Sequence, residues 1–299
     1  MRKLYLILPI LAGFMFGSSG IFVRTLTQNG IDQTTLLFLR FSIAIIPIAL
    51  AIMLTDKKLF RITLSDIPLF ILCAICIMGL NLCYNYSMNT IPLSLAAVLL
   101  STAPIFVLIF AFIFFKEKIT LKKITCIILA ITGCFLMTGV LENNLVSFSI
   151  HGIMSGIGAA LFWAIYLIAS KKSLDSGKHT FTILFYSVIL ISVSLIPFTN
   201  INQIVVFIDI NPLLTTIFLI LHSTLSFALP YILSTLSLNY MESGISSILL
   251  SGAEPSAAFI FGFLIYSEIP TALMFCGFAL TLTAIITLGK KEKNESNST

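Results

Sequence analysis

The chain has 299 residues, of which 58% are hydrophobic and 10% are charged, and its mean hydropathy is +1.08. Soluble domains carry about 25% charged residues, so this composition excludes a soluble globular protein and indicates a membrane protein. The formal net charge of +5 comes without a basic face that could bind DNA or RNA. We therefore expect no nucleic-acid partner.

Ten apolar stretches are each long enough to cross a bilayer, since about 20 residues of helix span the hydrocarbon core. They lack the alternating period of membrane strands. In the first half we expect helices over residues 4–26, 34–55, 66–88, 92–115 and 121–141. In the second half we expect them over residues 151–170, 180–199, 212–238, 243–267 and 270–289. The predicted fold class is an all-α membrane protein with ten transmembrane helices.

Residues 95–117 and 246–268 share one pattern at an offset of 151 residues, which aligns Pro104 with Pro255 and Glu117 with Glu268. The pattern predicts two repeats, residues 1–145 and 146–289, followed by a disordered cytoplasmic tail over residues 290–299. Each repeat holds five helices, so equivalent helices would cross the membrane in opposite directions. Such an inverted-topology repeat is typical of secondary transporters.

Charge predicts the orientation of this bundle. If the N-terminus is cytoplasmic, all 17 Lys and Arg residues except Arg24 and Arg40 fall in or next to cytoplasmic segments. Cytoplasmic loops of membrane proteins carry this excess of positive charge. We therefore predict a multi-pass protein of the cell membrane with both termini in the cytoplasm.

The duplicated pattern resembles a known family. A helix rich in small residues has a central proline followed thirteen positions later by a glutamate, and this resembles the EamA branch of the drug/metabolite transporter superfamily. The segments GFMFGSSGIFVR, LRF (39–41) and AEP (253–255) are similar to recurring elements of that branch, although Phe16-Gly17 replaces its usual Trp-Gly. The resemblance implies export or exchange of amino acids, metabolites or drugs, with relatives that handle nucleotide sugars and triose phosphates.

Two prolines occupy the middle of equivalent helices. Pro104 and Pro255 are predicted helix breaks or hinges, because irregular backbone at membrane depth is tolerated where it faces protein or a cavity. The alternative is that they only kink their helices to fit the bundle. Glu117 and Glu268, which follow them at opposite membrane faces, are predicted gating or structural charges.

Pairs of glycines at small-xxx-small spacing predict close helix contacts. This spacing lets two helix backbones approach each other, as is common in membrane bundles. The pairs are Gly13 with Gly17 and Gly152 with Gly156.

Ionisable residues inside a span are functional candidates, because burying them in hydrocarbon is costly. Glu254 shares a helical face with Ser251, and we expect it to bind a substrate amine or carry a proton. The alternative is a structural carboxylate bonded to backbone freed by the following proline. His222 could titrate or be a neutral structural group. Arg40 is predicted to be structural or gating, either extending outward or pairing with Asp32 or a substrate carboxylate.

Polar and aromatic residues recur at helical spacing on the third and sixth predicted helices. Such faces could line a cavity for an amphipathic solute, or could form hydrogen bonds between helices. The predicted substrate-binding residues are Asn81, Tyr84, Asn85, Trp163, Tyr166, His222, Ser251 and Glu254.

The sequence contains no clear motif for metal binding, nucleotide binding or catalysis. The six cysteines all lie within predicted spans, and the CxxC pair of Cys73 and Cys76 has no second pair to complete a metal site. We expect no metal and no cofactor. A P-loop for ATP is absent from the sequence, and no nucleophile or paired carboxylates indicate an enzyme.

These observations predict a secondary-active transporter that exports or exchanges small metabolites, first of all amino acids, by alternating access. Proton coupling through Glu254 is part of the hypothesis. The alternatives are another solute (a drug cation, a nucleotide sugar or a cofactor) and a passive channel or lipid scramblase. Both a monomer and a homodimer are compatible with the sequence.

Overall fold

The computed structural model describes residues 5–27, 31–139, 149–266 and 270–289, and no strand occurs within these ranges. The helices of the first half are α2 (Ile7–Gly17), α3 (Ser19–Thr27), α4 (Gln33–Thr55), α5 (Ile67–Thr90), α6 (Leu93–Leu100), α7 (Ala103–Phe115) and α8 (Leu121–Met137). Those of the second half are α9 (Ile150–Asp175), α10 (Thr180–Leu195), α11 (Ile201–Ile210), α12 (Pro212–Ser223), the π-helical turn η5 (Thr224–Ala228), α13 (Leu229–Ser237), α14 (Ser243–Tyr266) and α15 (Ala272–Gly289).

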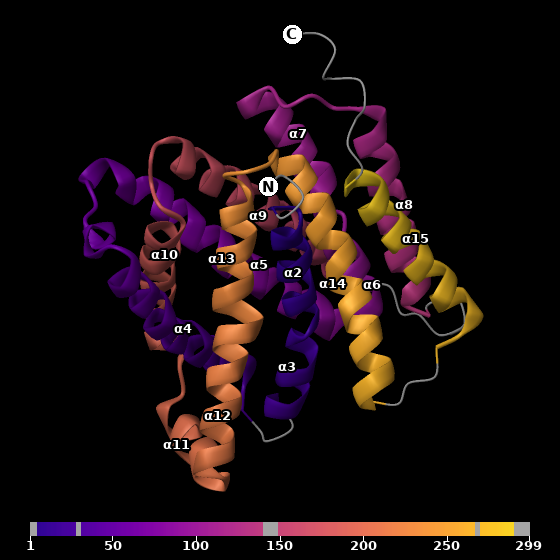
Figure 1. Cartoon of the computed structure of the whole chain (residues 1–299). Coiled ribbons are helices and arrows are strands. Elements are labelled where there is room, and N and C mark those ends of the chain that lie inside the picture. Colours follow the sequence, from indigo (N-terminus) through magenta and orange to yellow (C-terminus); the bar gives the residue numbers. More distant parts are fainter. Residues whose placement is uncertain (1–4, 28–30, 140–148, 267–269, 290–299) are drawn as a thin grey trace.

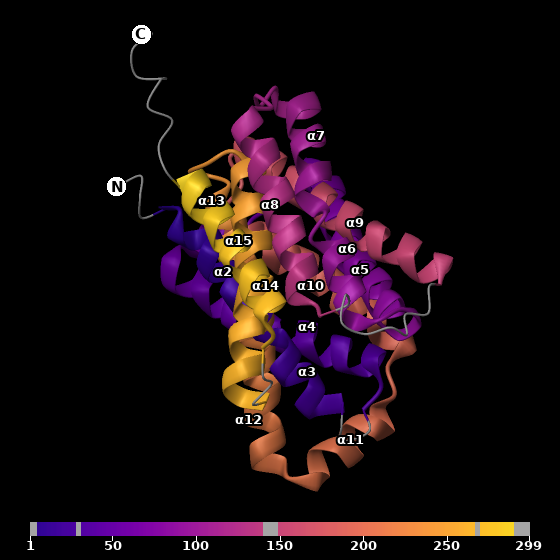
Figure 2. The same ribbon diagram turned by 90° about the vertical axis from the view of Figure 1, so that its right-hand side faces the viewer.

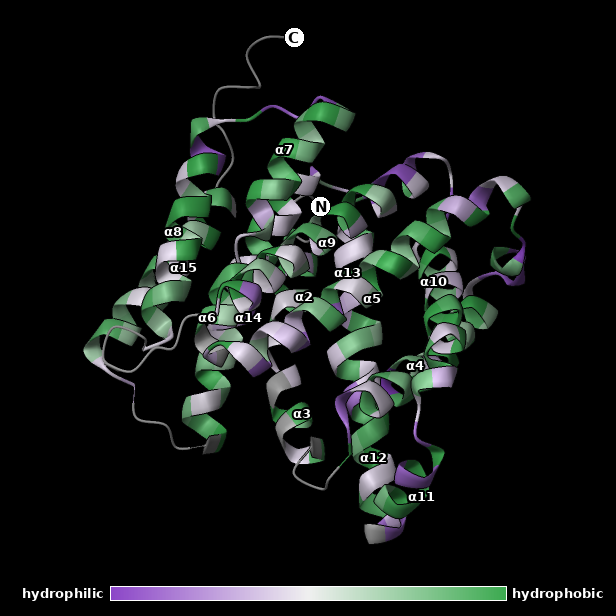
Figure 3. Cartoon of the chain, turned by 180° about the vertical axis from the view of Figure 1, so that it is seen from behind, coloured by the Kyte–Doolittle hydropathy of each residue, from purple (hydrophilic) through white to green (hydrophobic). Residues whose placement is uncertain are grey.

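Helix is present in each of the ten predicted stretches because a chain in lipid must satisfy its backbone groups internally. Eight helical segments are long and apolar enough to cross a membrane, and a shorter apolar stretch covers Ile7–Val23. Large apolar side chains such as Phe114, Ile128 and Leu264 are exposed on the outside of the bundle. Figure 3 shows the apolar colour along much of α7 and α8, as expected for helices in lipid. The chain is thus a multi-pass membrane protein.

The helices form one bundle in which the two halves are intermixed. The most extensive contacts between helices join α5 to α9, α8 to α15, α2 to α14 and α4 to α10, and each of these pairs takes one helix from each half. Figures 1 and 2 show α2 near the middle of the bundle, with α11 at the end opposite the C-terminal end of α13. The largest of three apolar core clusters in the described residues runs mainly through α4, α5, α9 and α10. Helices of the two halves are therefore buried against each other.

The predicted glycine contacts are confirmed. A Cβ atom placed on Gly13 would lie 2.8 Å from the Cβ of Ala253, so the α2 backbone lies directly against α14. A Cβ atom on Gly156 would lie 2.7 Å from Leu99 Cδ1 and 3.0 Å from Leu99 Cβ, so α9 packs closely against the Leu99 side chain of α6. Ordinary van der Waals contact begins at about 3.4 Å, so both positions exclude a larger side chain.

The two prolines differ in their surroundings. The fourth span is interrupted between α6 and α7, and Pro104 lies in the first turn of α7. In contrast, α14 continues through Pro255 without an interruption. The backbone of α14 at this level lies against Gly13 and Gly17 of α2, and this packing holds the helix together where the proline removes a hydrogen bond. The predicted helix break at Pro255 is therefore absent, whereas a hinge role stays a prediction at both positions.

Three sequence predictions lie outside the described residues. They concern Glu268, the boundary between the repeats at residues 145 and 146, and the tail over residues 290–299.

Candidate functional site

The eighth predicted span changes its helical geometry at membrane depth. Helix α12 passes into the π-helical turn η5 and then into α13, whose second residue is Pro230. Proline has no N–H to donate to the carbonyl four residues earlier, which here is that of Ser226. The Nη2 atom of Arg40 donates a hydrogen bond of 2.6 Å to this carbonyl instead. Single π-helical turns frequently occur at functional sites.

Arg40 points into the protein and is only 9% exposed. Its guanidinium lies 5.2 Å from the centre of the Phe227 ring, and Ser223 Oγ donates a hydrogen bond of 2.6 Å to the Arg40 carbonyl. Asp32 instead caps α4, where its two carboxylate oxygens accept hydrogen bonds from the N–H and the hydroxyl of Thr35. The expectation that Arg40 extends outward or pairs with Asp32 is therefore wrong.

His222 is buried next to Arg40. Its ring lies 5.8 Å from that of Phe22, and the charge of Arg40 is within electrostatic range of the imidazole. Within the described part of the chain, His222 Nδ1, Arg40 Nε and Ser226 Oγ are buried without a hydrogen-bond partner. Arg40 contacts the Ser226 backbone and lies within electrostatic range of His222, and we call Arg40, His222 and Ser226 the arginine cluster.

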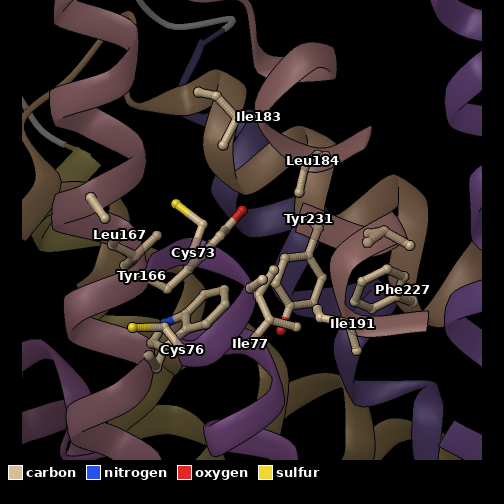
Figure 4. Close-up of a cluster of buried hydrophobic side chains, with 14 of the residues drawn as sticks. Cys73, Cys76, Ile77, Tyr166, Leu167, Ile183, Leu184, Ile191, Phe227 and Tyr231 are labelled. Atoms are coloured by element: carbon tan, nitrogen blue, oxygen red, sulfur yellow. The ribbon is translucent and has the colours of Figure 1, made fainter. Parts of the chain in front are cut away.

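A group of aromatic rings adjoins the arginine cluster. The Tyr231 ring lies 5.5 Å from that of Trp163, 5.3 Å from Tyr166, 5.2 Å from Phe16 and 4.5 Å from Phe227. Figure 4 shows Tyr231 beside Phe227, both surrounded by apolar side chains of neighbouring helices. We call these five residues the aromatic cluster. It joins α2 of the first half to α9, η5 and α13 of the second half.

Hydrogen bonds fix parts of the aromatic cluster. The hydroxyl of Tyr166 lies 2.6 Å from Thr235 Oγ1, so α9 and α13 are bonded to each other at this level. Asn81 donates to the carbonyl of Ile77 at 2.8 Å and also faces the Tyr231 hydroxyl. The alternative to a lining role for these polar stripes was hydrogen bonding between helices. The Tyr166 hydroxyl makes such a bond, and the Asn81 side chain makes one contact of this kind, with Tyr231.

Glu254 approaches the aromatic cluster from α14. Tyr231, Tyr84 and Cys134 are all within electrostatic range of its carboxylate. Among the described residues it accepts no hydrogen bond and has no cationic partner. This carboxylate differs from Glu117, which is fully engaged by backbone groups. A lone carboxylate in apolar surroundings calls for a cation or a proton.

The positive charge of Arg40 and the negative charge of Glu254 therefore both act on Tyr231. Tyr231 lies within electrostatic range of both Arg40 and Glu254. Arg40 comes from α4 in the first half, and Glu254 comes from α14 in the second half. The arrangement can bind a solute that carries both a negative and a positive group over an apolar and aromatic surface.

The structure brings some predicted site residues together and leaves others apart. Asn81, Trp163, Tyr166 and Glu254 lie around Tyr231, as described above, and Tyr84 lies within electrostatic range of Glu254. His222 belongs to the arginine cluster. Asn85 is half-buried on α5 and Ser251 is buried on α14, and neither has a hydrogen-bond or ring contact with the aromatic cluster among the described residues. Their roles stay predictions.

Sequence reasoning missed Tyr231, Phe227, Phe16 and Ser226 as site residues. A signal was present for two of them, because Phe227 and Tyr231 are four residues apart and fall on one helical face together with Thr235. For Ser226 the signal was Pro230, which frees the Ser226 carbonyl.

Glu117 binds the second half of the chain. Its two carboxylate oxygens accept hydrogen bonds from the N–H groups of Ser243 at 2.8 Å and Gly244 at 3.2 Å, at the start of α14. Free N–H groups at a helix start favour a negative partner. Lys123 forms an ion pair with Glu242 in the same connection. The connection from α13 to α14 is thus held by two side chains of the first half.

The described residues contain no group of three His, Cys, Asp or Glu side chains that lie close enough to bind one metal ion. Cys73 and Cys76 are free thiols in the packed core, and Cys73 Sγ lies 3.9 Å from Ser170 Oγ. A hollow lined by residues 197–202 opens on the surface at the connection from α10 to α11, away from both clusters.

Comparison with known proteins identifies the relatives of this chain. The family model described as the EamA-like transporter family matches residues 3–139 and again residues 150–289. An uncharacterized transporter of Clostridium kluyveri is 27% identical over 205 residues, which are 66% of this chain and 66% of that relative. The pseudopaline exporter CntI of Pseudomonas aeruginosa is 24% identical over 96% of both chains.

A solved structure supports the fold. A protein crystal structure superimposes on this chain with a TM-score of 0.77 over 96% of both chains. The two sequences are 12% identical, so the likeness concerns the fold alone.

Proposed function

The chain belongs to the EamA-like transporter family, and we propose that it exports or exchanges small solutes of the amino-acid class by alternating access. Membership of this family makes it a membrane transporter, which supports transport rather than an enzymatic activity. The observation that carries the proposal is the unpaired carboxylate of Glu254 next to the aromatic cluster. Export is supported by the relative CntI, which is described as an exporter.

We propose ten spans arranged as an inverted repeat. In such a repeat α2 corresponds to α9, α5 corresponds to α13 and α7 corresponds to α14. The contact of α5 with α9 should then have a counterpart between α13 and α2. The contact of α7 with α9 should have one between α14 and α2. Both members of each pair occur. The contact of α8 with α15 would map onto itself. In agreement, a Cβ atom on Gly133 would abut the Gly277 carbonyl at 2.6 Å, and one on Gly277 would abut the Gly133 carbonyl at 2.5 Å.

The proposed orientation places the termini and most lysines in the cytoplasm. Lys116 follows the C-terminal end of α7, and Lys178 follows that of α9. Lys171 lies within the last turns of α9, and Lys57 follows α4. These ends would face the same side in an alternating arrangement of spans. An excess of positive charge on one side favours that side as cytoplasmic.

Alternating access would require the two halves to move against each other around the aromatic cluster. The contacts of Glu117 and Lys123 with the connection from α13 to α14 join the halves on the proposed cytoplasmic side. They must break when the site opens to the cytoplasm, and we propose that they are its gate. Glu254 would be neutralised either by the amino group of the solute or by a proton, which couples transport to the proton gradient.

The test is counterflow in proteoliposomes. Purified protein is first screened for thermal stabilisation by the common amino acids, because a ligand stabilises the native state by RT ln(1 + [L]/Kd). Each amino acid that stabilises is then loaded inside vesicles and exchanged for labelled solute outside. We expect saturable counterflow that Glu254→Gln reduces at least about tenfold, since a charge-assisted contact is lost.

Asp175→Asn is the matched control. Asp175 pairs with Lys171 at the surface, where its side chain is 49% exposed, so removing this charge should leave counterflow unchanged. Normal counterflow in Glu254→Gln would exclude Glu254 from the site. Uptake that never saturates would support a channel instead. At clamped voltage, an imposed pH gradient should drive transport in the wild type and not in Glu254→Gln; indifference of the wild type would exclude proton coupling.

A further inference from the structure

Three buried polar groups with unsatisfied atoms meet where α4 packs against α12 and η5. They are Arg40, His222 and Ser226, whose exposed fractions are 9%, 1% and 0%. Buried polar atoms without a partner are uncommon in native proteins, and leaving them unsatisfied is costly. Three of them at one position indicate a place for a polar ligand.

The charge at this position is uncompensated by the described residues. Arg40 is protonated at any physiological pH. It lies within ion-pair distance of no described carboxylate, and its guanidinium lies 5.2 Å from the centre of the Phe227 ring. A buried guanidinium in such surroundings is stabilised by an anion that also accepts its hydrogen bonds.

The cluster is preorganised to receive such an anion. Arg40 is oriented by its bond to the Ser226 carbonyl, which Pro230 leaves free, and by the bond from Ser223 Oγ to its own carbonyl. One nitrogen is thereby used, whereas Nε has no partner among the described residues. A guanidinium with its orientation fixed and donors still available matches the geometry of a carboxylate.

We infer that Arg40, His222 and Ser226 form the subsite that binds the carboxylate group of the transported solute. The inference rests on the proposed function and extends it, because Glu254 takes the amino group while the arginine cluster takes the carboxylate. Tyr231 lies within electrostatic range of both charges, and its ring would contact the part of the solute between the two groups. The substrate class is therefore a zwitterion with an apolar or aromatic side chain.

The experiment compares amino acids with their carboxamides. L-leucine and L-leucinamide, and likewise L-phenylalanine and L-phenylalaninamide, share the amine and the side chain and differ in the carboxylate. Counterflow of each is measured in proteoliposomes with the full chain, and the ratio of acid to amide affinity is the readout. In the wild type we expect the acid to bind at least about tenfold more tightly, as for loss of one charge-assisted contact.

Variants assign this preference to the cluster. Arg40→Gln should bring the ratio near one while exchange of the amide persists. Ser226→Ala, which changes little volume, should lower the ratio several-fold and keeps the test valid if Arg40→Gln does not fold. Ser192→Ala is the matched control, because Ser192 Oγ is also buried without a partner but lies on α10 outside the cluster; its ratio should equal that of the wild type.

Each result decides between the two proposals. Equal affinity of the wild type for acids and amides would overturn the carboxylate subsite and leave the transport function standing. An unchanged ratio in folded Arg40→Gln and in Ser226→Ala would overturn the subsite in the same way. Absence of counterflow for both acids and amides would overturn the proposed function, and the inference with it.

Discussion

Replacing Gly13 by alanine tests whether the contact of α2 with α14 holds the two halves together. The new Cβ atom would lie 2.8 Å from the Cβ of Ala253 and 3.0 Å from the backbone nitrogen of Glu254. The first distance is about 0.6 Å shorter than an ordinary contact of about 3.4 Å. Since the obstacles belong to a helix backbone and a Cβ atom, no flexible side chain can turn away. The helices must separate.

Overpacking of this kind costs about 1–3 kcal/mol. One kcal/mol shifts the melting temperature of a domain of 150–250 residues by about 2–4 °C, so we expect Gly13→Ala to lower it by roughly 2–12 °C. The measurement is thermal unfolding of the purified full chain, followed by size-exclusion fluorescence. Because Glu254 lies at the contact, counterflow should fall as well.

Gly158→Ala is the matched control for this substitution. A Cβ atom on Gly158 of α9 would meet Cys83 Sγ at 3.6 Å, which is an ordinary contact. Alanine favours a helix over glycine by about 1 kcal/mol at both positions, so Gly158→Ala should be neutral or more stable. If Gly13→Ala melts at the same temperature as Gly158→Ala, the close contact of α2 with α14 does not exist.

Two further substitutions test the ends of the helices. Glu117→Ala should destabilise the protein by about 0.5–2 kcal/mol, because the N–H groups of Ser243 and Gly244 lose their acceptor, and an unchanged melting temperature would contradict this cap. Burial lowers the pKa of His179, whose Nδ1 accepts a hydrogen bond from the Phe181 N–H at the start of α10. The unfolded chain then binds more protons, so native stability should be lost as the pH falls through about 6.5, and His179→Asn should flatten this dependence between about pH 7 and 5.

The spans could be predicted from the sequence because lipid imposes a length and a composition on each of them. Their interruptions were harder to predict. Pro104 lies at a break, whereas Pro255 lies within a continuous helix, and the difference comes from packing of α14 on the two glycines of α2. The interruptions at Ser18 and at η5 involve no proline at the break itself. Local sequence gives little warning of such features, since they depend on neighbouring helices.

The candidate site was predictable where helical spacing alone decides which residues share a face. Trp163 and Tyr166 form one stripe and do meet the same partner. Their partner Tyr231 belongs to a helix that the sequence does not place next to α9. Arg40 shows a second limit: its depth allowed an extended, outward side chain, but the rotation of α4 and the carbonyl freed by Pro230 direct it inward. Crossing angles and helix rotations are set by contacts between distant segments.

The proposed subsites give a physical reason to expect exchange to exceed net export. Arg40 and Glu254 belong to different halves, and burying either charge without a partner costs several kcal/mol. In the proposed cycle a zwitterion would compensate both charges and contact both halves, whereas a proton would compensate Glu254 alone. The loaded protein should therefore pass through its closed states more readily than the empty one, because only the solute lowers the energy of both charges at once. Counterflow, in which the protein is loaded in both directions, is accordingly the condition in which these charges limit transport least.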